Sequence, residues 1–226
     1  MRENDLVYLF AALVPPREIL DELWSVADYM PGPPARELRQ TGWRRARRGL
    51  RHREVATAGV DAPAPVLDRA PVAHVQLVIA KFGNLALNDA NRLGEALGRS
   101  AADWSSPRLR LSGYSSHVTD GDPSIWVDLE GDLDALHAVA RGVHEVAKGL
   151  RLFVDRRIFQ PRVRLGSVRP SATEAEVEAL LAELDRFETN AWWQTGFGLF
   201  TPADQGPDEP SYRTYAEIPL GPHVVH

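Results

Sequence analysis

The chain has 226 residues, of which 44% are hydrophobic and 25% charged, and its net charge is -5 at pH 7. This composition is typical of a globular protein with a substantial core, and the negative charge excludes a generally basic nucleic-acid binder, although not a local basic groove. Cysteine is absent, which excludes disulfides, thiolate metal sites and a cysteine nucleophile. No segment approaches the ~20 apolar residues of a membrane span, and acidic residues precede the first short apolar run. We therefore expect a cytoplasmic protein without a signal peptide.

Apolar residues at intervals of three and four predict helices, and short apolar or alternating runs predict strands. In chain order, the sequence predicts a strand at 7–14, a helix to about Met30, a strand at 72–82, a helix at 88–101, strands at 108–117 and 124–130, a helix at 132–148, a strand pair or one long strand at 156–169, a helix from 171 to about Phe187, and strands at 191–200 and 212–218. Asn88 is the expected N-cap of one helix, and the spacing of Thr173 and Glu176 predicts a capping box at another.

This order of elements indicates a mixed α+β fold with two comparable halves. The antiparallel pairs and the long helix at 132–148 argue against a doubly wound parallel sheet. No phosphate-binding glycine loop is present, because Gly196-x-Gly198 lies in a strand pattern without a following helix. Residues 31–70 are rich in arginine and proline and predict a variable insertion, either a long loop or a partly helical segment. We expect a single domain of two pseudo-symmetric lobes over residues 1–226, with this insertion in the first half.

Two predicted strands carry paired polar side chains. Because side chains alternate along a strand, His74 and Gln76 share one face, and Arg162 and Arg164 share one face while Val163 points to a core. Buried polar groups need partners, so both patterns are explained if the two polar faces meet across a wet cleft. Four donors there would suit a phosphate, for which arginine is a favoured bidentate ligand. The same alternation is also typical of any half-exposed strand.

The phrases around these residues resemble the two-histidine (2H) phosphoesterases of the 2'-5' RNA ligase type, which carry two His-x-Thr motifs. Residues 74–83 read HVQLVIAKFG and residues 159–169 read FQPRVRLGSVR. Resemblance extends to the segments at 9–15, 125–136 and 212–221. It implies a two-lobed fold with antiparallel sheets, a central cleft and helices packed on the outside, and a monomer. We expect no cofactor.

The two motifs read His-x-Gln and Arg-x-Arg in place of the family's two His-x-Thr motifs. In the family, the histidines act as base and acid on a 2',3'-cyclic phosphate or a 2'-5' linkage, and the threonines hold phosphate oxygens. An arginine stays charged and cannot shuttle a proton. Loss of one acid–base partner typically removes on the order of 10²–10⁴-fold in rate. The resemblance thus implies His74 as an acid or base and Gln76, Arg162 and Arg164 as phosphate ligands.

Two functions remain open from the sequence. The first is a degenerate 2H phosphoesterase-like protein that binds a nucleotide or RNA end, with a 2',3'-cyclic or 2'-5' phosphate, with weak or no turnover. The second is an active RNA cyclic phosphodiesterase that uses His74 together with a histidine or tyrosine from elsewhere. A cleft repurposed for protein contact is a third alternative. Arg44, Arg45, Arg47 and Arg48 predict either an RNA-backbone patch or a solvated loop.

Other histidines and aromatic residues are given structural roles. His117 belongs to a literal His-x-Thr at a strand end and is expected in an exposed loop. His137 and His144 share one side of the helix at 132–148 without an acidic partner at ligand spacing, so we expect solvated or boundary positions and no metal site. Six aromatic residues near the C-terminal strands are expected mostly in the core, with one or two able to stack a base. They are Trp192, Trp193, Phe197, Phe200, Tyr212 and Tyr215.

Overall fold

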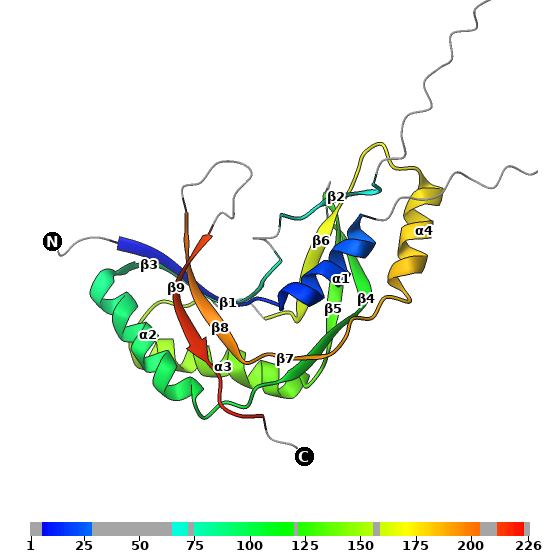
Figure 1. Cartoon of the computed structure of the whole chain (residues 1–226). Coiled ribbons are helices and arrows are strands. Elements are labelled where there is room, and N and C mark those ends of the chain that lie inside the picture. The colour runs from blue at the N-terminus through cyan, green and yellow to red at the C-terminus, as the bar shows by residue number, and fades with distance from the viewer. Residues whose placement is uncertain are drawn as a thin grey trace, which may run out of the picture.

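Two curled antiparallel sheets form the frame of the computed structural model (Figure 1). It describes residues 6–28, 65–71, 75–119, 122–155, 159–203 and 212–223, with backbone alone at 116–119 and 122. The strands are β1 (Leu6–Leu13), β2 (Leu67–Arg69), β3 (Leu77–Ala86), β4 (Arg108–Thr119), β5 (Asp122–Gly131), β6 (Arg162–Val168), β7 (Trp192–Trp193), β8 (Gly196–Pro202) and β9 (Tyr212–Pro219). The helices are α1 (Arg17–Ala27), α2 (Leu87–Ala101), α3 (Leu133–Gly149) and α4 (Glu174–Leu184). One sheet has the strand order β3-β1-β8-β9 and the other β2-β6-β5-β4-β7.

Helices cover one face of each sheet. α2 and α3 pack against each other and against the four-stranded sheet, whereas α1 and α4 pack against the five-stranded sheet (Figure 1). In α1 the buried residues Ile19, Leu20, Leu23 and Ala27 recur at helical spacing and form the face that meets the sheet. The mixed α+β fold with two antiparallel sheets and packed helices is the one expected from the sequence. None of the described helices is long and apolar enough to cross a membrane.

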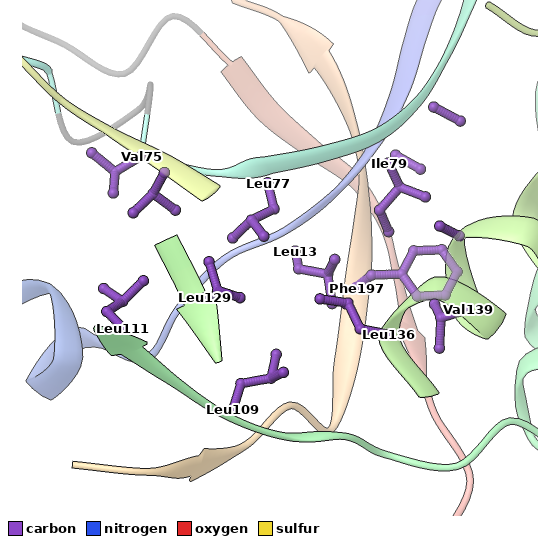
Figure 2. Packing of buried hydrophobic residues seen from close by; sticks show 14 of the residues in the cluster. Leu13, Val75, Leu77, Ile79, Leu109, Leu111, Leu129, Leu136, Val139 and Phe197 are labelled. Carbon is purple, nitrogen blue, oxygen red and sulfur yellow. The ribbon is translucent and has the colours of Figure 1, made fainter. Parts of the chain in front are cut away.

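A continuous hydrophobic core joins the two sheets. Figure 2 shows Leu13 and Leu77 of the four-stranded sheet in the same cluster as Leu129 of β5 and Leu136 of α3. All four side chains are at most 3% exposed. Because interiors pack densely and resist shear, this shared core holds the sheets in one relative position and therefore fixes the distance between side chains on their other faces.

Helix starts show one confirmed prediction and one error. The capping box is present, since the Thr173 hydroxyl accepts from the backbone N–H of Glu176 and the Glu176 carboxylate accepts from the backbone N–H of Thr173 at 2.8 Å. The prediction of Asn88 as an N-cap is wrong, because α2 already begins at Leu87 and Asn88 lies inside it. β3 runs directly into α2 at Ala86, so no loop residue precedes the helix to cap it.

Residues 191–200 do not form the single strand predicted. β7 pairs with β4 in one sheet, and β8 pairs with β1 and β9 in the other. Gln194 is buried between β7 and β8, where the chain passes from one sheet to the other. It accepts a hydrogen bond from the Trp192 indole N–H (3.0 Å) and donates one to the Gly196 carbonyl (2.6 Å). These bonds satisfy a buried amide at the bend, and a run of strand-forming residues does not reveal such a change of sheet.

Several strand boundaries also differ from the prediction, and one strand was not predicted. β3 starts only at Leu77 and continues to Ala86, because its second half pairs with the start of β1 around two register shifts. β6 is confined to Arg162–Val168, where β2 and β5 flank it. Residues Leu67–Arg69 of the expected insertion form β2, the edge strand beside β6. Residues 31–64 of that insertion lie outside the described residues.

Candidate functional site

A cleft with a volume of about 450 Å³ lies between residues of the two sheets. Gln76, directly before β3, and Lys81, within β3, line it on one side. Arg162 and Arg164 of β6 line it on the other. The structure therefore brings three of the four predicted motif residues to one cavity. The fourth, His74, lies outside the described residues, as do Arg44, Arg45, Arg47 and Arg48.

Alternation along β6 positions the two arginines. Val163 and Leu165 are fully buried on the face toward the core, so Arg162 and Arg164 emerge on the opposite face, which lines the cleft. In the register with β5, Trp126 lies opposite Arg164. The strand face that the sequence predicted to be polar is thus the cleft wall of the five-stranded sheet.

Neighbouring side chains orient both guanidinium groups. The guanidinium carbon of Arg162 lies 4.8 Å from the centroid of the Trp126 ring, within the range of a cation–π contact. This contact uses the face of the planar group, whereas an anion is bound through the N–H donors at its edge, so the two are compatible. Arg164 donates from Nη2 to the Ser167 hydroxyl at 2.7 Å. Both arginines are half-buried, which strengthens their interaction with an anion relative to bulk water.

Asp155 reaches the cleft from the segment that follows α3. Its backbone N–H donates to the Lys81 carbonyl at 2.9 Å, which attaches this segment to β3. Its carbonyl lies 3.2 Å from Nε2 of His144, whose Nδ1 lies 2.8 Å from the Ala140 carbonyl. The position of Asp155 is therefore set both by the four-stranded sheet and by α3.

An aromatic group closes one side of the cleft. Tyr212, at the start of β9, lines the cavity and meets Phe10 edge-on, with ring centroids 4.9 Å apart. Phe10 in turn stacks on Phe200 at 5.7 Å. Of the six aromatic residues expected mostly in the core, Trp192 and Phe197 are buried, while Trp193 is 38% exposed. Tyr212 is placed where a base could stack.

Charge in the cleft differs in sign from the whole chain. Among the described lining residues, Lys81, Arg162 and Arg164 are cationic and Asp155 alone is anionic. Sequence reasoning missed Lys81 and Asp155, although Lys81 belongs to the quoted first phrase and could have been found there. Nothing in the sequence connects Asp155 to β3, because the link is a backbone hydrogen bond between distant segments.

The remaining histidines do not form a metal site within the described part of the chain. His137 and His144 are half-buried, as expected, and His137 meets Phe159 edge-on at 5.6 Å. The side chain of His117 lies outside the described residues. Across the described ranges, no group of three or more His, Asp or Glu side chains is placed to hold a metal ion.

Comparison with solved structures identifies the fold. No family model matches the chain, and no curated protein matches it. E. coli LigT complexed with 3'-AMP is 14% identical, with a TM-score of 0.60 over 96% of this chain and 99% of LigT. TT0787 of Thermus thermophilus is 18% identical, with a TM-score of 0.56 over 94% and 97% of the two chains. A structure described as a phosphoesterase is 14% identical, with a TM-score of 0.56 over 96% and 99%.

LigT has also been crystallised with NADP+ and with ATP. At these identities the similarity establishes the fold. It is the two-sheet 2H phosphoesterase fold that the resemblance implied.

Proposed function

We propose that this protein binds a phosphate-bearing ligand, a nucleotide or an RNA end, in the cleft between the two sheets, with weak or no turnover. The observation that carries the proposal is the convergence of Gln76, Arg162 and Arg164 on one cavity. An amide N–H₂ and two guanidinium groups supply only donors to a phosphate, and charge-assisted bonds of this kind are the strong ones. The 3'-AMP complex of LigT supports a nucleotide as the ligand class.

Weak turnover follows from the residue types in the second motif. By resemblance, Arg162 occupies the place of a catalytic histidine, and a guanidinium can stabilise charge but cannot accept a proton at neutral pH. Its stacking on Trp126 fits a holding role. A single histidine in the first motif would leave one proton transfer unassisted, which typically costs on the order of 10²–10⁴-fold.

An active RNA cyclic phosphodiesterase is the second candidate, and one observation favours it. Tyr212 lines the same cavity, and a phenol can act as a proton donor or acceptor in catalysis. In that case His74 and Tyr212 would share the acid–base work. The RNA-backbone patch at Arg44, Arg45, Arg47 and Arg48, a cytoplasmic location and a monomeric state stay predictions.

Calorimetric titration with adenosine 3'-monophosphate tests the proposed function. The double variant Arg162→Gln/Arg164→Gln should abolish binding, whereas Arg99→Gln, an exposed arginine on α2, should leave it unchanged. A turnover assay with 2',3'-cyclic AMP runs beside it. Absence of binding in the unchanged protein contradicts the proposal, and turnover that is lost in His74→Ala favours the phosphodiesterase.

A further inference from the structure

Ionisable residues on both walls of the cleft set its preference for ligand charge. Lys81 comes from β3, Arg162 and Arg164 come from β6, and Asp155 is the one carboxylate among the described residues that line the cleft. All four are half-buried and lie beside apolar side chains such as Val78 and Phe159. In such surroundings the effective dielectric constant is lower than in water, so a difference of one charge on the ligand changes its affinity.

Phosphate ligands fall into two charge classes at neutral pH. A cyclic phosphate or a diester carries one negative charge and two non-bridging oxygens. A terminal phosphomonoester has a second pKa of about 6, so it carries close to two negative charges and three strong acceptor oxygens at pH 7. The described lining of the cleft carries three cations and one anion, which matches the charge of the monoester better than that of the diester.

The donors are also distributed in a way that suits three oxygens. Arg162 and Arg164 approach from the five-stranded sheet, whereas Gln76 and Lys81 approach from the four-stranded sheet. The third oxygen of a terminal phosphate is an acceptor, but in a diester or cyclic phosphate it is bonded to carbon and carries no full charge. When a diester or cyclic phosphate is bound, the donors of one cleft wall would therefore face this weaker acceptor, and their hydrogen bonds would contribute less to affinity.

We infer that the cleft selects a terminal phosphomonoester of a nucleotide or RNA end over a cyclic phosphate or an internal diester. This inference rests on the proposed function and narrows its ligand class. On this inference, the protein binds the terminal phosphate that hydrolysis of a phosphodiester produces, and not the phosphodiester itself.

A matched pair of ligands tests the inference. 2'-Deoxyadenosine 3'-monophosphate and its methyl ester share base and sugar, differ by one charge, and lack the 2'-hydroxyl needed to form a cyclic phosphate. Titration calorimetry at pH 7.5 should give a dissociation constant for the monoester that is at least ~10-fold lower than that for the methyl ester. At pH 5.0 the monoester is mostly a monoanion, so the ratio should fall below about 3. Because both ligands meet the same protein at each pH, the ratio removes those effects of the protein's own titration that act equally on a monoanion and a dianion.

Variants separate charge from simple contact. Lys81→Met and Arg164→Gln each remove one positive charge and should lower the monoester-to-ester ratio by at least ~3-fold, since each charge acts more strongly on the dianion. Gln76→Leu removes a donor without changing the charge, so it should weaken binding but change the monoester-to-ester ratio less than either charge-removing variant. Arg99→Gln, an exposed arginine on α2 that does not line the cleft, is the matched arginine control. Thermal unfolding of each variant checks that it is folded.

The possible outcomes test the preference for a monoester separately from phosphate binding itself. Binding of neither ligand overturns both. Equal or tighter binding of the methyl ester at pH 7.5 overturns the inference and leaves phosphate binding intact. A ratio that does not fall at pH 5.0 also overturns it, because the preference would then come from the missing methyl group and not from charge.

Discussion

Arg162 lies over the indole ring of Trp126, with 4.8 Å between its guanidinium carbon and the ring centroid, although the two residues sit on different strands, β6 and β5. The contact joins the Arg162-Val163-Arg164 segment to the neighbouring strand. Because the guanidinium is planar, a ring packed on its face fixes its plane, and with it the direction in which its N–H groups point. The first prediction concerns this pair.

Replacement of Trp126 by leucine should weaken phosphate binding without abolishing it. A cation–π contact of this kind contributes about 0.5–2 kcal/mol, so we expect roughly 2- to 30-fold lower affinity for adenosine 3'-monophosphate by calorimetry. Trp193→Leu, on the edge strand β7 and outside the cleft, is the control. Unchanged affinity in Trp126→Leu would show that the ring does not orient Arg162 for ligand binding.

Introducing the His-x-Thr residues of the phosphoesterases that the sequence resembles should create or raise turnover. The triple variant Gln76→Thr, Arg162→His and Arg164→Thr brings a titratable group and two hydroxyls into the cleft, and one acid–base partner is worth on the order of 10²-fold or more. Hydrolysis of 2',3'-cyclic AMP, followed by chromatography, measures the gain over the unchanged protein. If the unchanged protein already hydrolyses the substrate as fast as the triple variant, the holding role of Arg162 is wrong.

Gly198 should be intolerant of a side chain, because a Cβ there would come within 2.4 Å of the Phe200 ring. Gly198→Ala must displace Phe200, which stacks on Phe10 beside the cleft, and overpacking of this kind costs typically about 1–3 kcal/mol. Urea unfolding measures the loss. Gly98→Ala in α2 has open space at the Cβ and should be neutral or stabilising by about 0.5–1 kcal/mol. Equal stability of the two variants would contradict the packing at Gly198.

Thr173→Ala should destabilise α4 by about 1 kcal/mol, the usual contribution of an N-cap. The effect should depend on pH. The backbone N–H of Thr173 donates to the Glu176 carboxylate and lowers the pKa of Glu176 below its ordinary 4.5, with a further contribution from the Thr173 hydroxyl. A carboxyl whose pKa is lowered in the folded state stabilises above its unfolded pKa and loses that contribution as the pH falls through its folded pKa.

Alanine keeps the backbone N–H of residue 173 and removes only the hydroxyl, so the variant loses only the hydroxyl's part of this pKa effect. The difference in unfolding free energy between the unchanged protein and Thr173→Ala should thus be constant from pH 7 to about pH 5 and shrink slightly as the pH falls below 4.5. Urea titrations at several pH values measure it. Ser171→Ala, an exposed residue before the cap, should show no such trend. A difference that grows on acidification would contradict the assigned direction of the pKa.

Local sequence signals predicted the parts of the fold that depend on neighbours in the chain. The capping box at Thr173, the apolar stripe of α3 and the alternation that turns Arg162 and Arg164 away from the core all act within a few residues. The order of such phrases along the chain was enough to indicate the two-sheet fold, which the comparison with LigT confirms. The prediction of Asn88 as a cap failed because a strand passes into α2 without a loop.

What the sequence determined by itself is therefore most of the elements, apart from β2 and the division of residues 191–200 into β7 and β8, and the faces on which Gln76, Arg162 and Arg164 lie. Only the tertiary structure decided which groups meet there. Asp155 joins the cleft through a backbone bond to Lys81. The register of β5 and β6 places Trp126 opposite Arg164, from where its ring reaches Arg162, the diagonal neighbour. Alternation assigns a side chain to a face, but register and sheet membership are set by packing between segments far apart in the chain, so neither can be read from one strand.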